Sequence, residues 1–247
     1  YSIELKRLVY TSLDEYEKYQ LHKKASEILL DLHKENKVNI IDELVYQLMN
    51  INNKELAANL VLKEAKQQKN RFTSYAISQW ELAYAIVKDT EYKEILNILD
   101  TLTEIYLLKT NLDITEYYLD NLLYYAKQEN NKEYIIKAKY YKIETHIIKN
   151  QLDIADKLVK ELEELSKSED IHEGKIICEL IRSKLALNRS QLEIVQKYLL
   201  KAMELSNKYK IEKYLGNIYN LLGLYNHLNG NIPLAIEHFN NSIDFYD

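Results

Sequence analysis

A short apolar pattern recurs four times along this chain at a constant spacing. The four segments align without gaps and are TNLDITEYYLDNL from Thr110, NQLDIADKLVKEL from Asn150, SQLEIVQKYLLKA from Ser190 and GNIPLAIEHFNNS from Gly230. Four mainly apolar columns run through them: Leu112, Leu152, Leu192 and Ile232; Ile114, Ile154, Ile194 and Leu234; Leu119, Val159, Leu199 and Phe239; and Leu122, Leu162, Ala202 and Ser242. A period of this size, about 40 residues, predicts a solenoid, in which each repeat packs against its neighbours.

The composition favours helices over strands as the building block. The 247 residues include one Pro and four Gly, whereas a β-sandwich or α/β domain of this length needs many turns, which usually contain these residues. Hydrophobic residues make up 47% of the chain, which is enough to build a core and argues against a disordered chain. We therefore expect an all-α protein of long helices joined by short loops.

Each repeat is predicted to contain two amphipathic helices. In the last repeat, spacings of three and four residues separate the apolar positions Leu215, Ile218, Leu222 and Tyr225. Gly230 follows where the first helix must end, because glycine adopts the left-handed conformation of a helix C-cap without a steric clash. Asn150 occupies the matching position two repeats earlier, and asparagine also tolerates that conformation.

The stretch LLGLYNHLNGNIPLAIEHFNNSI carries two small residues, Gly223 and Ala235, the turn residue Gly230, and the aromatic Phe239 four residues after Ala235. In these positions it resembles the tetratricopeptide (TPR) repeat. The resemblance implies a right-handed superhelical solenoid of stacked antiparallel helix hairpins. The earlier repeats depart from the family pattern at the small positions, with Thr103, Ile143 and Ser183 in place of Gly223 and with Thr115, Ala155 and Val195 in place of Ala235.

The pattern divides the chain into an N-terminal helical junction segment, 1–52, and a TPR-like array, 53–247. The array is predicted to contain five hairpins, at about 53–89, 91–129, 131–168, 170–208 and 211–247. About 13 helices are expected, with breaks near Leu13, Asn36, Asn52, Asn70, Thr90, Asn111, Asn130, Asn150, Asp170, Ser190, Tyr209 and Gly230.

The start of the chain suggests a junction with another domain. Ser12 and Glu15 have the spacing of a helix capping box. The segment also resembles the link between the ATPase module and the TPR array of large bacterial signal-transduction ATPases of the STAND type. The residues that carry this resemblance are Val9, Tyr10, Leu13, Glu17, Leu21, His22, Ala25 and Leu29. It implies an ATPase upstream and an output domain downstream. The chain also lacks an initiator Met, and we expect it to be an excised piece of a longer protein.

Charge and cysteine content limit the kinds of partner. Lys and Arg total 33 and Asp and Glu total 38, so the net charge of −5 argues against nucleic-acid binding, although Tyr and Lys interleave in LLYYAKQ and KAKYYKIE. No apolar run is long enough to span a membrane. The single cysteine, Cys178, cannot form an internal disulfide, which favours a cytoplasmic location.

No motif for catalysis or cofactor binding is present. The chain has no phosphate-binding GxxxxGK[ST] loop, no GxGxxG and no HExxH, so we expect neither a cofactor nor an enzyme. The closest group to a metal site is Glu169, Asp170, His172 and Glu173, which we interpret as an inter-hairpin loop with a helix cap at Asp170. Cys178 falls in an apolar column and is predicted to be a buried thiol, and His22 is predicted to be a helix-packing residue.

The TPR resemblance implies a binding groove lined by the first helix of each hairpin. Carried over by register, the groove positions are Asn97, Asp100, Glu104, Lys137, Tyr140, Glu144, Ile177, Leu180, Lys184, Asn217, Asn220 and Leu224. Lys137 and Asn217 match the clamp that some TPR proteins use for a C-terminal carboxylate. Asp100 and Glu104 would repel a carboxylate, so that clamp is not predicted.

Three functional hypotheses follow from these observations. The first is a non-catalytic protein–protein interaction or sensor scaffold, cut from a larger bacterial signal-transduction protein, whose partner is a protein, a peptide or another domain of the same parent chain. The second is a stand-alone TPR adaptor or peptide-binding regulator. The third, an enzyme, has no supporting motif. A homodimer through the C-terminal repeat is also possible, because its outer face carries Ile243, Phe245 and Tyr246.

Overall fold

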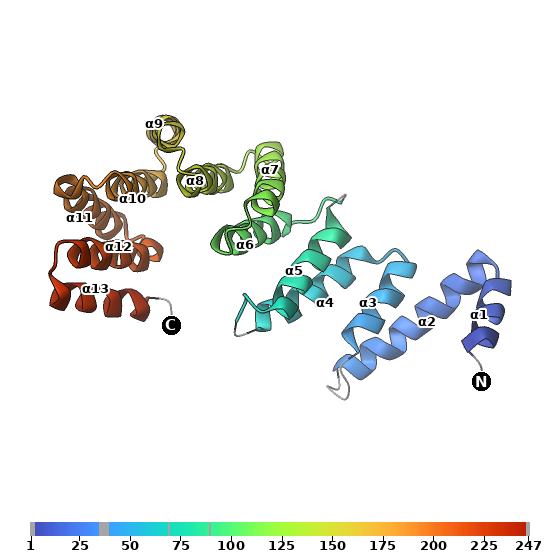
Figure 1. Cartoon of the computed structure of the whole chain (residues 1–247). Coiled ribbons are helices and arrows are strands. Elements are labelled where there is room, and N and C mark those ends of the chain that lie inside the picture. Colours follow the sequence, from blue (N-terminus) through green and yellow to red (C-terminus); the bar gives the residue numbers. More distant parts are fainter. Residues whose placement is uncertain (1–2, 35–39, 69, 89, 246–247) are drawn as a thin grey trace. The chain divides into compact units, whose positions relative to one another are not determined.

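The computed structural model describes residues 3–34, 40–68, 70–88 and 90–245. Throughout these ranges the secondary structure is helical, with thirteen α-helices and one short 3₁₀ turn, and consecutive helices pack in pairs (Figure 1). The predicted all-α helical solenoid and the predicted number of helices are confirmed. The chain divides into two compact units, Tyr1–Ile105 and Tyr106–Asp247.

The first unit contains α1 to α5, and the boundary between the units falls within α6. The bounds are α1 Ile3–Ser12, α2 Glu15–Lys34, α3 Ile41–Asn50, α4 Lys54–Gln67, α5 Ser74–Val87 and α6 Ile95–Leu108. The second unit continues with α7 Leu112–Gln128, α8 Lys132–Ile148, α9 Leu152–Ser168, α10 His172–Asn188, α11 Leu192–Tyr209, η1 Glu212–Tyr214, α12 Leu215–Leu228 and α13 Ile232–Asp244.

Several sequence-based predictions concern residues or properties that the structure does not describe. The break predicted near Asn36, the end of the first hairpin at residue 89 and the C-terminal residue Tyr246 lie outside the described residues. The right-handed superhelical twist and the division of the chain at residue 52 remain predictions.

The helices from α6 to α12 end in the same way and at a constant interval. A single residue with positive φ follows each helix, and the series is Thr110, Asn130, Asn150, Asp170, Ser190, Lys210 and Gly230. The next backbone N–H then bonds to the carbonyl five residues earlier, as in Asn131 N to Ala126 O at 2.8 Å. This is the Schellman closure, which satisfies carbonyls that the helix end leaves free. Every helix with its link therefore spans the same length of chain, and a hairpin spans twice that length.

Small and large residues alternate at the contact between the two helices of a hairpin. A Cβ added to Gly223 would lie 2.6 Å from the Phe239 ring, so only glycine accommodates the aromatic residue there. In the two preceding hairpins, the residue aligned with Gly223 is larger than glycine and the residue aligned with Phe239 is smaller than phenylalanine. These pairs are Ile143 with Val159, and Ser183 with Leu199. All four of these residues are buried. The Ser183 hydroxyl donates to a carbonyl of its own helix, which explains how a polar residue is accommodated in the core.

The N-terminal helices differ from the capping expectation. Ser12 donates its hydroxyl to the carbonyl of Val9 at the end of α1 and does not cap α2. Asp14 and Glu17 form the reciprocal capping box instead, with bonds of 2.7 and 2.9 Å between each side chain and the other's backbone N–H. Both Ser12 with Glu15 and Asp14 with Glu17 have the spacing of a capping box. Because Ser12 is the last residue of α1, Asp14, directly before α2, provides the cap.

His22 is buried and joins α1, α2 and α3, in agreement with its predicted packing role. Its Nε2 lies 2.7 Å from the Tyr10 hydroxyl and its Nδ1 lies 2.5 Å from Gln47 Oε1. Because Gln47 Oε1 only accepts, Nδ1 carries the proton and Tyr10 donates to Nε2. Gln47 Nε2 then donates to Glu43, so the chain of hydrogen bonds reaches the surface of α3.

We expect Gly230→Ala and Lys210→Gly to change stability in opposite directions. Gly230 has φ 77° and no atom near its missing Cβ, so Ala adds only backbone strain, of about 1 kcal/mol. Lys210 has φ 54°, and Gly there removes strain and raises stability by up to about 1 kcal/mol. Urea denaturation of both variants checks this, and shifts of the same sign would contradict the left-handed assignment.

We expect Gly223→Ser alone to destabilise the last hairpin by about 1–3 kcal/mol, because the new side chain overlaps the Phe239 ring. In a Phe239→Leu background, which copies the Ser183 and Leu199 pair of the preceding hairpin, the same change should cost clearly less. A double-mutant cycle measured by thermal unfolding gives the coupling. Additive effects would show that the two positions are energetically independent.

Candidate functional site

The predicted groove residues fall into two sets. Asn97, Asp100 and Glu104 lie on α6 in the first unit, and the others lie on α8, α10 and α12 in the second. Within the second unit α8 contacts α10, and α10 contacts α12. Figure 1 shows these three helices on the inner side of the unit, with α9 and α11 outside them. The structure therefore brings the predicted residues of the second set onto adjacent first helices, as the register predicted.

The centre of this surface is a cluster of three side chains from two helices. Lys184 on α10 donates to Glu144 on α8 over 2.7 Å, and the Lys184 ammonium lies 5.9 Å from the centre of the Tyr140 ring. The Glu144 side chain is 11% exposed and that of Lys184 is 27% exposed. A partly buried ion pair thus joins neighbouring repeats on the face that the sequence assigned to binding.

The electrostatics of the cluster keep Lys184 charged. Burial opposes the ammonium form, but the neighbouring Tyr140 and Glu144 outweigh it and raise the pKa of Lys184 above its usual value. Because the positive charge of Lys184 is already matched by Glu144, the cluster offers no free cation to an incoming carboxylate. It offers an aromatic ring beside a fixed ion pair.

Two predicted groove residues are not available on this surface. Ile177 is 0% exposed and Leu180 is 3% exposed, so the expectation that they line the groove is wrong. Ile177 packs in the core with Ile136, Ile143 and Val159. Register transfer assumed one open face for each first helix, but α10 contacts α8, α9, α11 and α12, and Leu180 packs in the core with Val195 and Ile218.

The remaining predicted positions are partly or fully accessible. Lys137 lies 4.8 Å from the Tyr134 ring centre and 3.8 Å from Glu133. On α12, Asn217 is half-buried, and Asn220 and Leu224 are exposed. In the first unit, Asn97, Asp100 and Glu104 are half-buried, and Glu104 accepts an ion pair from Arg71 at 2.9 Å.

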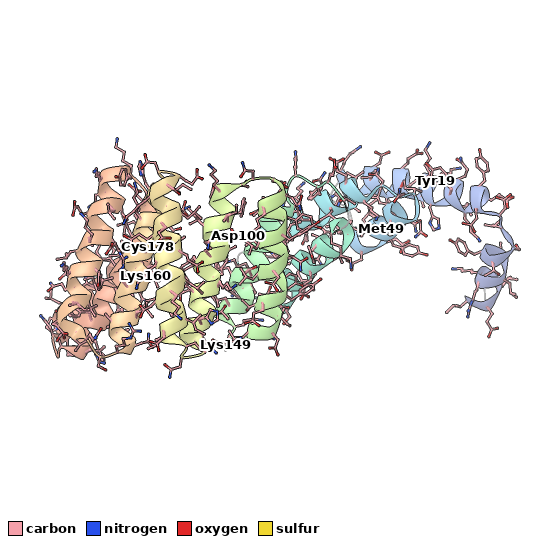
Figure 2. The ribbon with its side chains drawn as sticks, turned by 90° about the horizontal axis from the view of Figure 1, so that it is seen from above. Tyr19, Met49, Asp100, Lys149, Lys160 and Cys178 are labelled. Carbon is pink, nitrogen blue, oxygen red and sulfur yellow. The ribbon has the colours of Figure 1, made fainter. Side chains whose placement is uncertain are left out.

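A second set of inter-repeat contacts was not predicted. Glu116 near the start of α7 pairs with Lys149 at the end of α8, and Asp156 of α9 pairs with Arg189 after α10 at 2.5 Å. In the next repeat Gln196 accepts from the Tyr225 hydroxyl at 3.5 Å. Figure 2 shows the long helices of the second unit side by side and labels Lys149 near one end. The acid and the base are separated by the same length of sequence in both ion pairs, and this recurrence was the signal that could have revealed them.

The residues considered as metal ligands do not converge on one point. Glu169 pairs with Lys132, Asp170 with Lys175, and Glu173 with Lys213, so these carboxylates face separate lysines. No group of three or more His, Cys, Asp or Glu side chains suited to a metal ion occurs in the described part of the chain.

The predicted burial of Cys178 is confirmed, and burial raises the pKa of its thiol to about 12. The Tyr and Lys interleaving around Tyr140 does not give a basic aromatic strip either. Tyr141 is buried, and Lys139 pairs with Glu161 at 3.2 Å.

Two of the surface hollows that lie away from the predicted groove differ in character. One, of about 930 Å³, is lined by mixed charges from α10 and α11, including Arg182 and Lys201. The other, of about 340 Å³, is apolar and lies between α1 and α2, where Leu5, Val9 and Leu21 line it. Neither hollow gathers convergent catalytic groups.

Comparisons with known proteins add little to this description. No protein-family profile and no curated protein matches the sequence. Among solved structures, the chain is similar to BtubC (BKLC) from P. vanneervenii, with 13% identity and a TM-score of 0.48 over 95% of this chain and 91% of that one. A similarity of this size says nothing about function. None of the helices in the described ranges is long and apolar enough to cross a membrane.

We expect Lys184→Met to destabilise the second unit by about 1–3 kcal/mol, because it leaves the buried Glu144 without its cation. Adding Glu144→Leu should recover much of this loss, since a pair of apolar residues needs no charge partner. The matched control is Lys201→Met in the exposed pair with Glu204, which should leave stability nearly unchanged because solvent screens that pair. Equal losses for Lys184→Met and Lys201→Met would contradict the structural role of the cluster.

Proposed function

We propose that the chain is a non-catalytic protein-binding scaffold, and that the inner face of α8, α10 and α12 is its binding surface. The observation that supports the proposal is the inter-repeat pair between Glu144 and Lys184, which holds the Tyr140 ring in place on this face. A surface whose side chains are already ordered loses little conformational entropy when a partner binds.

The chemistry of the face favours a particular kind of partner. The charges of its central cluster are matched internally, while the exposed amide of Asn220 supplies hydrogen bonds and the ring of Tyr140 supplies an apolar contact. We infer a protein segment read through its main chain and uncharged side chains. A terminal carboxylate or a run of acidic residues would find no free cation in the Lys184 cluster.

The first unit supports a place within a larger signalling protein. On α1, no residue is buried, and Leu5, Leu8 and Val9, which share one face at spacings of three and four residues, are exposed. An apolar helix face of this kind suits contact with another domain of the same chain, as the STAND resemblance implies. We place this scaffold in the cytoplasm, where the lone thiol of Cys178 stays reduced. The alternative is a stand-alone adaptor or peptide-binding regulator that uses the same inner face.

A peptide-display selection against the full 247-residue chain tests the binding proposal. Selected peptides should lose at least about tenfold in affinity against Tyr140→Ala and Asn220→Ala. Tyr124→Ala is the control, because Tyr124 on α7 is exposed and lies outside the inner face. Peptides that bind all variants equally, or that lose affinity only against the control, would contradict the proposed surface.

The size of the native protein separates the two settings. An immunoblot of the source cells, with an antibody raised against this chain, should give a band far above 29.3 kDa if the scaffold belongs to a multidomain protein. A single band near 29.3 kDa would leave the stand-alone adaptor.

A further inference from the structure

The exposed side of α7 carries a stripe in which carboxylates and tyrosine rings alternate. This α7 stripe consists of Asp113, Tyr117, Asp120 and Tyr124. Their spacings of four, three and four residues place all four side chains along one side of a helix. All four residues are exposed, Tyr117 by 52% and Tyr124 by 59%. Each turn of this side of α7 therefore presents either an acid or an aromatic ring to the surroundings.

The stripe is open because of its position in the repeat and not because it lies near an end of the chain. The matching side of α9 shows this, since α9 contacts α8 and α10 and has further hairpins before and after its own. Its residues Lys157, Lys160 and Glu164, which match Tyr117, Asp120 and Tyr124, are nevertheless exposed. The array thus leaves this side of a second helix uncovered even where the repeats continue in both directions.

The chemistry of these positions on α7 differs from that on the later second helices. At the two central positions α9 has Lys157 and Lys160, and α11 has Lys197 at the first of them, so these helices carry their own cations. On α13 the matching residues include the acids Glu237 and Asp244 but no aromatic ring. Only α7 among these four helices combines acids and rings without a base at the four positions.

The two carboxylates of the stripe lack a basic partner. Glu116 on the same helix pairs with Lys149, which shows that an acid on α7 can find a lysine of the next helix. In the part of the chain that the structure describes, no Lys or Arg pairs with Asp113 or Asp120. Two uncompensated negative charges therefore lie one turn away from exposed aromatic rings.

The two rings are also held in place by their neighbours. Tyr117 lies edge-on to Tyr118, with ring centres 5.1 Å apart and planes at 70°, and Tyr124 lies edge-on to Tyr125 at 5.2 Å and 82°. Tyr118 is buried and Tyr125 is half-buried, so each exposed ring rests on a residue that is fixed in the array. Rings that are already ordered lose little conformational entropy when a partner binds.

The inner face of the protein shows how a tyrosine and a carboxylate on one helix receive a cation. Tyr140 and Glu144 lie one turn apart on α8, and Lys184 reaches them from α10. Its ammonium donates to Glu144 at 2.7 Å and lies 5.9 Å from the centre of the Tyr140 ring. The pairs Asp113 with Tyr117 and Asp120 with Tyr124 have the same separation of four residues on α7. The α7 stripe thus supplies the acid and the ring of this arrangement twice, without the cation.

From these observations we propose that the α7 stripe binds a basic segment of a partner protein, with one basic side chain at each acid–tyrosine pair. Arginine suits the site best, because its planar guanidinium stacks on an aromatic ring and also donates to a carboxylate. The two pairs are seven residues apart, which is about 10 Å along a helix. An extended segment covers that distance with basic residues three positions apart.

This contact is separate from the inner face of α8, α10 and α12. The central cluster of the inner face has no free charge and is proposed to read uncharged groups, whereas the α7 stripe requires a cation. A variant of Tyr124 should therefore affect a basic ligand and leave ligands of the inner face unchanged. The two proposals can fail independently of each other.

Titration of the full 247-residue chain with the peptide GSRGSRGS at low ionic strength, followed by NMR, tests the proposal. We expect saturable binding that shifts the ring signals of Tyr117 and Tyr124. The same peptide with citrulline in place of both arginines keeps the shape and removes the charge, and it should bind at least about tenfold more weakly. Absence of saturable binding by the arginine peptide, or equal binding of the two peptides, would overturn the proposal.

Variants of the chain separate a specific site from general charge attraction. Asp120→Asn and Tyr124→Leu should each lower the affinity for the arginine peptide by at least about threefold, because each removes one part of an acid–tyrosine pair. The matched control is Glu164→Gln on α9, which removes one negative charge at the exposed position that matches Tyr124 and should leave the affinity unchanged. Equal losses for Asp120→Asn and Glu164→Gln would show that the peptide follows only the net charge, and they would overturn the assignment to the α7 stripe.

Discussion

The left-handed residue after each helix is the constraint on which the second unit depends. It recurs at a constant interval from Thr110 to Gly230, and the backbone bond that follows it closes the helix end. Because each helix and its link have the same length, side chains at matching positions of successive hairpins meet the same neighbours. The apolar columns, the small positions opposite large ones and the acid–base contacts between repeats all require that constant length. Non-glycine residues in this conformation store strain, and the packing of the helices on both sides offsets it.

Polar contacts between repeats serve two purposes in this fold. The pairs Glu116 with Lys149 and Asp156 with Arg189 join the outer helix of one hairpin to the end of the next inner helix. The pair Glu144 with Lys184 joins inner helices directly and orders the surface beside Tyr140. Apolar packing is non-directional, so it holds neighbouring helices together but only weakly fixes how far one helix is shifted along the other. The polar pairs fix that register. The same groups that stabilise the array therefore also determine the charge that the proposed binding face presents.

The proposed binding face is built from matched charges, an amide and an aromatic ring, which suits a partner recognised by hydrogen bonds and shape. A partner that presents only negative charge would gain little from this face, because Lys184 is already paired with Glu144.

The sequence alone determined the helical class, the number of helices and the ends of most of them. These features follow from local periodicity and from residues such as Gly230, whose backbone freedom is read directly from the chain. The repeat register also placed Tyr140, Glu144 and Lys184 on the first helices of neighbouring hairpins, where the structure brings them together, but the same register wrongly assigned Ile177 and Leu180 to the open surface. Only the tertiary structure showed that Ile177 is buried, that Asp14 caps α2, and which acid pairs with which base. Those outcomes depend on how many neighbours surround each helix and on where long side chains reach in three dimensions, which local spacing does not encode.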